Sequence, residues 1–230
     1  MKKRTLALFI TGGTLAVLFV TLIILLKTVD VGAIGPEGST VGLSALNKAF
    51  ADITGTNMTW YDVTEYLGYC EIGLALGFVL LAAVQAFGRK NIKKTDRDLL
   101  LLVGFDFLLA ALYLLFDVIP INYRPLLMEG RLEPSFPSTH TMIAVFVTSS
   151  ALYQSLIRIK KPAIKCIYIA VISAIGVMVI AGRVISGVHW LTDILGGALL
   201  GGTDDEIPLK AVVALDISQI HDEKTPSCVK

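Results

Sequence analysis

The chain has 230 residues, of which 54% are hydrophobic and 17% are charged, and its formal net charge is +1. Soluble domains average about a quarter charged residues, so this chain has too few charges to cover a water-facing surface. The composition therefore excludes an ordinary soluble domain and indicates an integral membrane protein. The balanced charge gives no sign of a nucleic-acid partner, and none is expected. The three scattered cysteines form neither a disulfide framework nor a metal-ligand pattern.

Apolar segments recur along the chain at lengths that suit membrane-spanning helices. A helix rises 1.5 Å per residue, so about 20 apolar residues cross a hydrocarbon core of about 30 Å. The expected spans are 6–26, 67–87, 99–119, 141–157, 164–181 and 190–202, the last of which is short. The first span is too long for the apolar core of a signal peptide. The sequence thus predicts an all-α, polytopic membrane protein with six transmembrane helices in a bundle.

Basic residues cluster in every second connection, at residues 2–4, 89–97 and 158–165. All three clusters fall on one side if every segment spans, and the positive-inside rule makes that side cytoplasmic. Both termini are then cytoplasmic, and the connections at 27–66, 122–140 and 182–193 face outward. In the first of these, Leu43, Leu46, Phe50 and Ile53 have helical spacing and predict a short amphipathic helix at the interface. This helix either covers the outer ends of the spans or admits a lipid.

The other two outer connections carry the residues that could take part in catalysis. His140 and His189 are expected at the same membrane face, together with Arg124, Arg183 and Asp193. His189 and Asp193 are four residues apart, which on a helix places both side chains on one face. A carboxylate bonded to one imidazole nitrogen fixes the tautomer and leaves the other nitrogen as a nucleophile.

Anion-binding groups accompany these histidines. Ser138 stands where the fourth span begins, and the free N–H groups of a first helical turn bind anions. Arg124 and Arg183 can each hold phosphate oxygens with a bidentate guanidinium. Taken together, these residues suit phosphoryl transfer, in which catalysis is mostly positioning and charge stabilisation.

Three motifs carry a resemblance to a known family. Arg124-Pro125, then Pro137-Ser138-Thr139-His140, then Arg183-x5-His189-x3-Asp193 resemble the signature motifs of the type 2 phosphatidic acid phosphatase superfamily. That superfamily includes lipid phosphate phosphatases, undecaprenyl-pyrophosphate phosphatases and vanadium haloperoxidases. The order of the motifs, their spacing and the six-helix layout agree over residues 1–202.

The resemblance implies a role for each motif residue. His189 would attack phosphorus and become a phosphohistidine, Asp193 would orient it, and His140 would protonate the leaving lipid oxygen. The residues implied to hold phosphate oxygens are Arg124, Ser138, the Thr139 backbone N–H and Arg183. Members of the superfamily generally need no metal for hydrolysis, so no cofactor is expected.

The chain departs from the family pattern at three positions. Asp117 stands where the first motif usually begins with Lys, which removes one phosphate ligand and leaves Arg131 as a candidate replacement. Thr139 replaces the usual Gly, and Gly182 replaces the usual Ser before Arg183. The first change is the one expected to affect activity or substrate preference.

The expected function is a membrane phosphatase that hydrolyses lipid phosphates or pyrophosphates at the extracytoplasmic face, in a bacterial plasma membrane. Its partners would be the lipid substrate and the bilayer, with the oligomeric state left open. One alternative is a catalytically weak relative that binds anionic lipid or acts as a structural membrane protein. Another is a small transporter that uses the polar outer cluster for an anion. Against it, no charged residue except Asp106 is expected deep in a span. The phosphatase domain is expected at 1–203, followed by a divergent, disordered cytoplasmic tail at 204–230.

Overall fold

The computed structural model describes residues 2–202, with side chains from residue 10 onward. Its helices are α1 (Lys2–Thr28), α2 (Ser44–Thr54), α3 (Met58–Gly88), α4 (Arg97–Val118), α5 (Thr139–Arg158) and α6 (Pro162–Ser186), followed by a shorter helix at Leu191–Gly202. Two single 3₁₀ turns, η1 (Pro36–Gly38) and η2 (Ile92–Lys94), lie in connections. Between residues 2 and 202, β pairing is limited to isolated bridges, so the all-α prediction is confirmed. The tail predicted at 204–230 lies outside the described residues.

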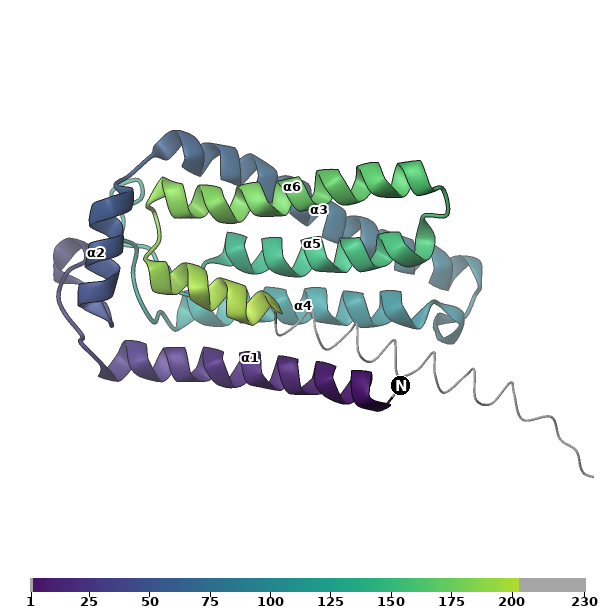
Figure 1. Cartoon of the computed structure of the whole chain (residues 1–230), viewed down its shortest axis with the longest axis horizontal. Coiled ribbons are helices and arrows are strands. Elements are labelled where there is room, and N and C mark those ends of the chain that lie inside the picture. Colours follow the sequence, from purple (N-terminus) through teal and green to yellow (C-terminus); the bar gives the residue numbers. More distant parts are fainter. Residues whose placement is uncertain (1, 203–230) are drawn as a thin grey trace, which may run out of the picture.

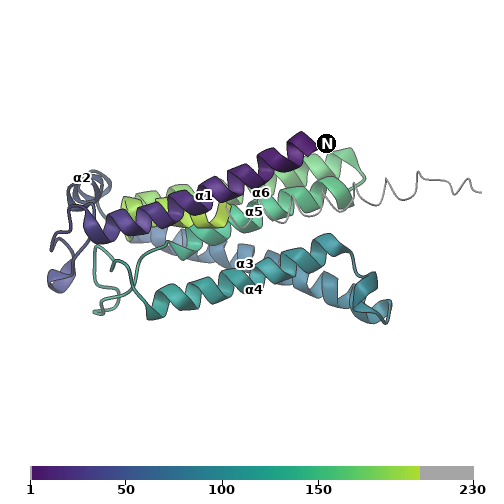
Figure 2. The same cartoon turned by 90° about the horizontal axis from the view of Figure 1, so that it is seen from below.

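The long helices run along a common direction, and α2 crosses one end of the bundle (Figure 1). The beginning of α1, the α3–α4 connection and the α5–α6 connection all lie at the opposite end (Figures 1 and 2). These are the three places where the sequence concentrates basic residues. The structure therefore confirms that the basic clusters share one end of the molecule, which the sequence assigns to the cytoplasm.

Membrane-spanning character is clearest in four of the helices described between residues 2 and 202. Residues Ile10–Thr28 of α1, and α3, α4 and α6, are long and apolar enough to cross a bilayer. Large apolar side chains on these helices, such as Leu80, Leu114 and Ile167, point away from the protein interior. These features make the chain an integral membrane protein. The predicted count of six spans also requires α5 and Leu191–Gly202 to cross the bilayer. These two helices do not meet the same criteria of length and apolar composition.

Helix α5 fails that test because it lies inside the bundle, where side chains contact protein instead of lipid. Its buried residues include polar ones such as Thr141, Ser150 and Gln154. The helix Leu191–Gly202 packs closely against it. A Cβ atom at Gly197 would lie 2.5 Å from the Ser138 carbonyl oxygen, so a larger residue would separate the two helices.

The same close approach continues one turn further along the last helix. A Cβ atom at Gly201 would lie 2.5 Å from the Met142 carbonyl oxygen on α5. Gly197 and Gly201, four residues apart, thus both pack directly on α5. This contact holds the start of α5 beside the start of the last helix, and both of these helix ends carry predicted site residues.

Helix α3 begins earlier than the sequence indicates. The expected outer connection reaches residue 66, whereas the helix begins at Met58. The Asn57 side chain accepts a hydrogen bond from the backbone N–H of Trp60 at 3.2 Å and so caps the extra turns. The short amphipathic helix in the same connection is confirmed as α2. The earlier start of α3 places Glu65 in a helix beside α6.

At the opposite end, a polar clasp joins α4 to α5. Arg158 contacts Asp96 at 2.8 Å through Nη1 and Asp98 through Nη2. Gln85 of α3 also donates a hydrogen bond to Asp96, at 3.0 Å. The hydrogen bond from Arg158, followed by those from Gln85 and Arg89, lowers the pKa of Asp96 to about 2, although burial acts to raise it.

Candidate active site

A β-hairpin between α4 and α5 positions Arg124. The backbone N–H of Arg124 donates to the Glu133 carbonyl at 3.0 Å, and Ser135 N–H donates to the Asn122 carbonyl at 3.0 Å. The hairpin closes at Glu129 and Gly130, both with positive φ (50° and 74°), as a two-residue hairpin loop requires. This paired backbone fixes where the Arg124 side chain begins.

The Arg124 guanidinium lies beside His189. Its Nη1 atom is 3.5 Å from the imidazole Nε2 of His189 and 3.5 Å from the Val188 carbonyl oxygen. Its Nε atom is 3.2 Å from a carboxylate oxygen of Glu133. The hairpin thus places a permanent cation next to the nitrogen that the sequence predicts as the nucleophile.

His189 lies in the turn between α6 and the last helix, where Gly187 ends α6 in the left-handed region at φ 63°. The prediction that His189 and Asp193 share one helix is therefore wrong, because the last helix begins at Leu191. The two side chains nevertheless meet, with His189 Nδ1 3.7 Å from Asp193 Oδ2. The Asp193 carboxylate reaches back because it also accepts a hydrogen bond from the Trp190 backbone N–H, at 3.0 Å, as the third residue of a helix does in a capping box.

The surroundings of His189 favour its neutral form. The side chain is only 4% exposed. Burial, then the positive charges of Arg124 and Arg183, hold the pKa of His189 well below its usual range. A neutral imidazole keeps a lone pair on one ring nitrogen, so His189 has the protonation state that a nucleophile needs.

Arg183 is completely buried in the last turn of α6. Its Nη2 atom donates a hydrogen bond to Glu65 at 2.6 Å, and its guanidinium lies 5.0 Å from the centre of the Tyr61 ring. The neighbouring Gly182 allows this contact, because a Cβ atom there would lie 2.3 Å from Thr64 on α3. The glycine that departs from the family pattern is thus the one that lets α3 and α6 touch.

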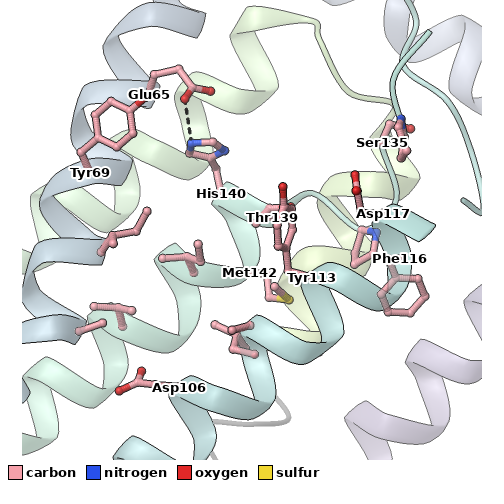
Figure 3. A pocket seen from close by; sticks show the side chains of 18 of the residues that line it. Glu65, Tyr69, Asp106, Tyr113, Phe116, Asp117, Ser135, Thr139, His140 and Met142 are labelled. Atoms are coloured by element: carbon pink, nitrogen blue, oxygen red, sulfur yellow. Dashed lines mark ion pairs between the residues drawn. The ribbon is translucent and has the colours of Figure 1, made fainter. Parts of the chain in front are cut away.

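His140, in the first turn of α5, faces the same carboxylate. Its Nε2 atom lies 3.4 Å from the second oxygen of Glu65, as Figure 3 shows. Gly68 of α3 makes space for the ring, because a Cβ atom there would lie 2.6 Å from His140 Cδ2. Glu65 belongs to none of the motifs and was missed by the sequence analysis. A carboxylate beside an apolar span was its only signal.

The two remaining predicted phosphate ligands differ in exposure. Ser138 precedes the first residue of α5, as predicted, but its side chain is completely buried. Its hydroxyl accepts a hydrogen bond from Thr141 at 3.1 Å, and its backbone N–H donates to the Asp193 carbonyl at 2.9 Å. Thr139, in contrast, lines a cavity. The structure therefore brings Thr139 into open space and keeps the Ser138 hydroxyl behind it.

That cavity has a volume of about 740 Å³ and runs from the polar cluster into apolar surroundings. Arg124, His140 and His189 line its polar part, and apolar side chains of α3, α4 and α5 line the rest. Asp106 lies in the apolar part, away from His140 (Figure 3). Asp117 also lines the cavity. Arg131 does not, because it is exposed at the turn of the hairpin, so the structure gives it no place as a substitute for the family lysine.

Comparison with known proteins agrees with this architecture. Residues 117–203 match the family model of the PAP2 superfamily, which confirms the resemblance predicted from the motifs in that part of the chain. A solved structure described as the first transmembrane PAP2 type phosphatidylglycerolphosphate phosphatase from Bacillus subtilis has a similar fold, with a TM-score of 0.58. The match has 23% sequence identity and covers 90% of this chain and 96% of that chain. No curated protein matches the chain.

Proposed function

We propose that this chain is a membrane phosphatase that hydrolyses lipid phosphates or pyrophosphates through a phosphohistidine at His189. One observation carries the proposal. A buried imidazole lies between the carboxylate of Asp193 and the guanidinium of Arg124, and it lines a cavity that continues among apolar side chains. A nucleophile, an orienting anion and a phosphate-binding cation are thereby gathered where an acyl or prenyl chain can also be buried.

In the first step, Nε2 of His189 attacks phosphorus and forms an N–P bond while the P–O bond to the lipid breaks. Asp193 keeps the proton on Nδ1 and stabilises the positive charge that develops on the ring. His140 donates a proton to the leaving oxygen. In the second step, water attacks phosphorus, His140 accepts a proton from it, and inorganic phosphate leaves as His189 is restored.

Unpaired donors support the placement of the phosphate group. The Nε and Nη1 atoms of Arg183 are buried without a hydrogen-bond partner among the described residues. Leaving such donors unpaired is costly, and phosphate oxygens would accept from them. Arg124 would hold the same phosphate group from the opposite side, together with the Thr139 backbone N–H. Ser138 would complete the set of phosphate ligands, with its buried hydroxyl behind Thr139.

The apolar part of the cavity supports a lipid substrate. Its lining includes Ile72, Leu76, Leu109 and Val147, which suit a hydrocarbon chain. The candidates are undecaprenyl pyrophosphate, phosphatidic acid and phosphatidylglycerol phosphate, the last of which is named for the similar Bacillus subtilis protein. The site lies at the end of the bundle opposite the basic clusters, which supports an extracytoplasmic site in a bacterial plasma membrane.

Asp117 favours a second candidate, a catalytically weak relative that binds anionic lipid. Its carboxylate lines the cavity where the family places a lysine, so one positive charge is replaced by a negative one. Like charges disfavour a phosphate nearby and would slow turnover. This candidate predicts binding of anionic lipid without phosphate release.

The two candidates are separated by phosphate release from purified protein in detergent, across monophosphate and pyrophosphate lipids. We expect wild-type protein to release phosphate and His189→Ala to lose at least about 10³-fold in rate, because the nucleophile is gone. Brief incubation with a ³²P-labelled lipid should leave acid-labile label on wild type only. Folded wild-type protein that binds these lipids and releases nothing would establish the lipid-binding candidate instead.

A further inference from the structure

The two carboxylate oxygens of Glu65 contact two different site residues. One oxygen is 2.6 Å from Arg183 Nη2, and the other is 3.4 Å from His140 Nε2. Each of the three comes from a different helix, because Glu65 lies on α3, His140 on α5 and Arg183 on α6. The Glu65 side chain is 23% exposed, so solvent screens these contacts only partly.

A general acid must carry a proton before the leaving group departs. Most groups near His140 disfavour the protonated form of its ring. Arg183 on α6 and Arg124 in the hairpin repel a positive charge on the ring, as does His189 whenever it is protonated. Partial burial of the ring has the same effect. Glu65 is the carboxylate in contact with His140, and its negative charge stabilises the protonated ring.

The contact also selects a nitrogen. An imidazolium has two N–H groups, and Nε2–H of His140 is directed at Glu65. Nδ1–H is then the group left to donate to the substrate. Gly68 fixes this arrangement, because only a residue without a side chain lets the ring lie against α3.

We propose that Glu65 is the positioning residue of the general acid, which orients His140 and stabilises its protonated ring while it fixes Arg183. The proposal rests on the proposed function. When the P–O bond breaks, the proton on Nδ1 of His140 moves to the lipid oxygen, and the neutral ring keeps its Nε2–H on Glu65. Water attack returns a proton to Nδ1. Two carboxylate–histidine pairs thus serve opposite tasks, with Asp193 orienting the nucleophile and Glu65 the acid.

The test compares two leaving groups through kcat/KM, which covers the steps up to formation of the phosphoenzyme. A medium-chain alkyl phosphate releases an alkoxide that needs a proton, whereas p-nitrophenyl phosphate releases a stable phenolate. Glu65→Gln is expected to lower kcat/KM about 10- to 100-fold for the alkyl phosphate and less than about 3-fold for the aryl phosphate. His140→Asn should show the same difference between the substrates, and Glu65→Asp should recover part of the loss.

Glu71→Gln is the matched control, because Glu71 is a buried carboxylate on the same helix that contacts Thr148 and lies outside the cavity lining. It should leave both values unchanged. Equal losses with the two substrates in both Glu65 variants, or no loss in either, would overturn the role of Glu65 while leaving the phosphatase intact. Folding is checked by size-exclusion chromatography, and Glu65→Asp alone carries the test if Glu65→Gln aggregates. A wild-type protein inactive on every substrate would overturn the proposed function and this role together.

Discussion

A missing side chain on α3 controls where the His140 ring can lie. A Cβ atom at Gly68 would come within 2.6 Å of His140 Cδ2, closer than carbon atoms pack. We expect Gly68→Ala to push the ring away from Glu65 and to lower phosphate release at least about 10-fold, because misplacing a reacting group by about 1 Å is costly.

Gly73→Ala provides the matched control for this substitution. Gly73 lies on the same helix, and a Cβ atom there would meet nothing within 4 Å. Initial rates of phosphate release from the same lipid should be unchanged in this variant. Equal activity of Gly68→Ala and wild type would show that His140 is not held against α3.

Motif spacing was sufficient to bring Arg124, His140, His189 and Asp193 into one neighbourhood, although the reason given for the last pair was wrong. Their proximity comes from a carboxylate that caps a helix, and sequence separation alone does not distinguish that from a shared helix face. Glu65 was beyond reach for a different reason. Its partner Arg183 is 118 residues away, and that contact arises only from the packing of α3 on α6.

At the scale of elements, the clasp between α4 and α5 should stabilise the bundle without affecting catalysis. Replacing Arg158 by Met removes the cation that contacts Asp96 and Asp98. We expect the Tm in detergent to fall by about 2–4 °C at neutral pH, which corresponds to roughly 1 kcal/mol, with phosphate release retained. Arg97→Met, an exposed arginine nearby, should leave the Tm unchanged.

The pH dependence of the same clasp follows from the lowered pKa of Asp96. The Arg158 hydrogen bond is the main cause that brings this pKa from 3.8 to about 2. The folded state therefore binds fewer protons than the unfolded state between these values, and the contribution is present above about pH 4 and lost as the pH falls towards 2. The Tm difference between wild type and Arg158→Met should shrink over this interval. A difference that stays constant would show that Asp96 is not the partner that matters.

Element boundaries show what local patterns can and cannot predict. Apolar runs located the long helices because a bilayer imposes both their length and their composition. The extra turns at the start of α3 contain polar residues and depend on the Asn57 cap, so hydropathy missed them. Helix α5 is the converse case. Because α5 lies inside the bundle, its side chains need not be apolar, and its sequence is therefore less hydrophobic than those of the helices around it.

At the scale of the whole molecule, one end carries the basic connections and the other carries the site. The charge asymmetry could be predicted from sequence because it depends on counting residues between spans. The depth and shape of the cavity could not be predicted from the sequence, because they depend on how α3, α4, α5 and the hairpin pack around it. If the positive-inside rule fixes the orientation, the hairpin must face outward in the cell.

Thiol labelling in intact bacteria tests this orientation directly. In a cysteine-free background, Arg131→Cys places a thiol at the exposed turn of the hairpin, and Lys160→Cys places one in the exposed α5–α6 connection. A membrane-impermeant maleimide should label the first in intact cells and the second only after permeabilisation, because the α4–α5 and α5–α6 connections lie at opposite ends of the bundle (Figure 1). The reverse pattern would put the site on the cytoplasmic side, and the substrate would then have to be a lipid of the inner leaflet.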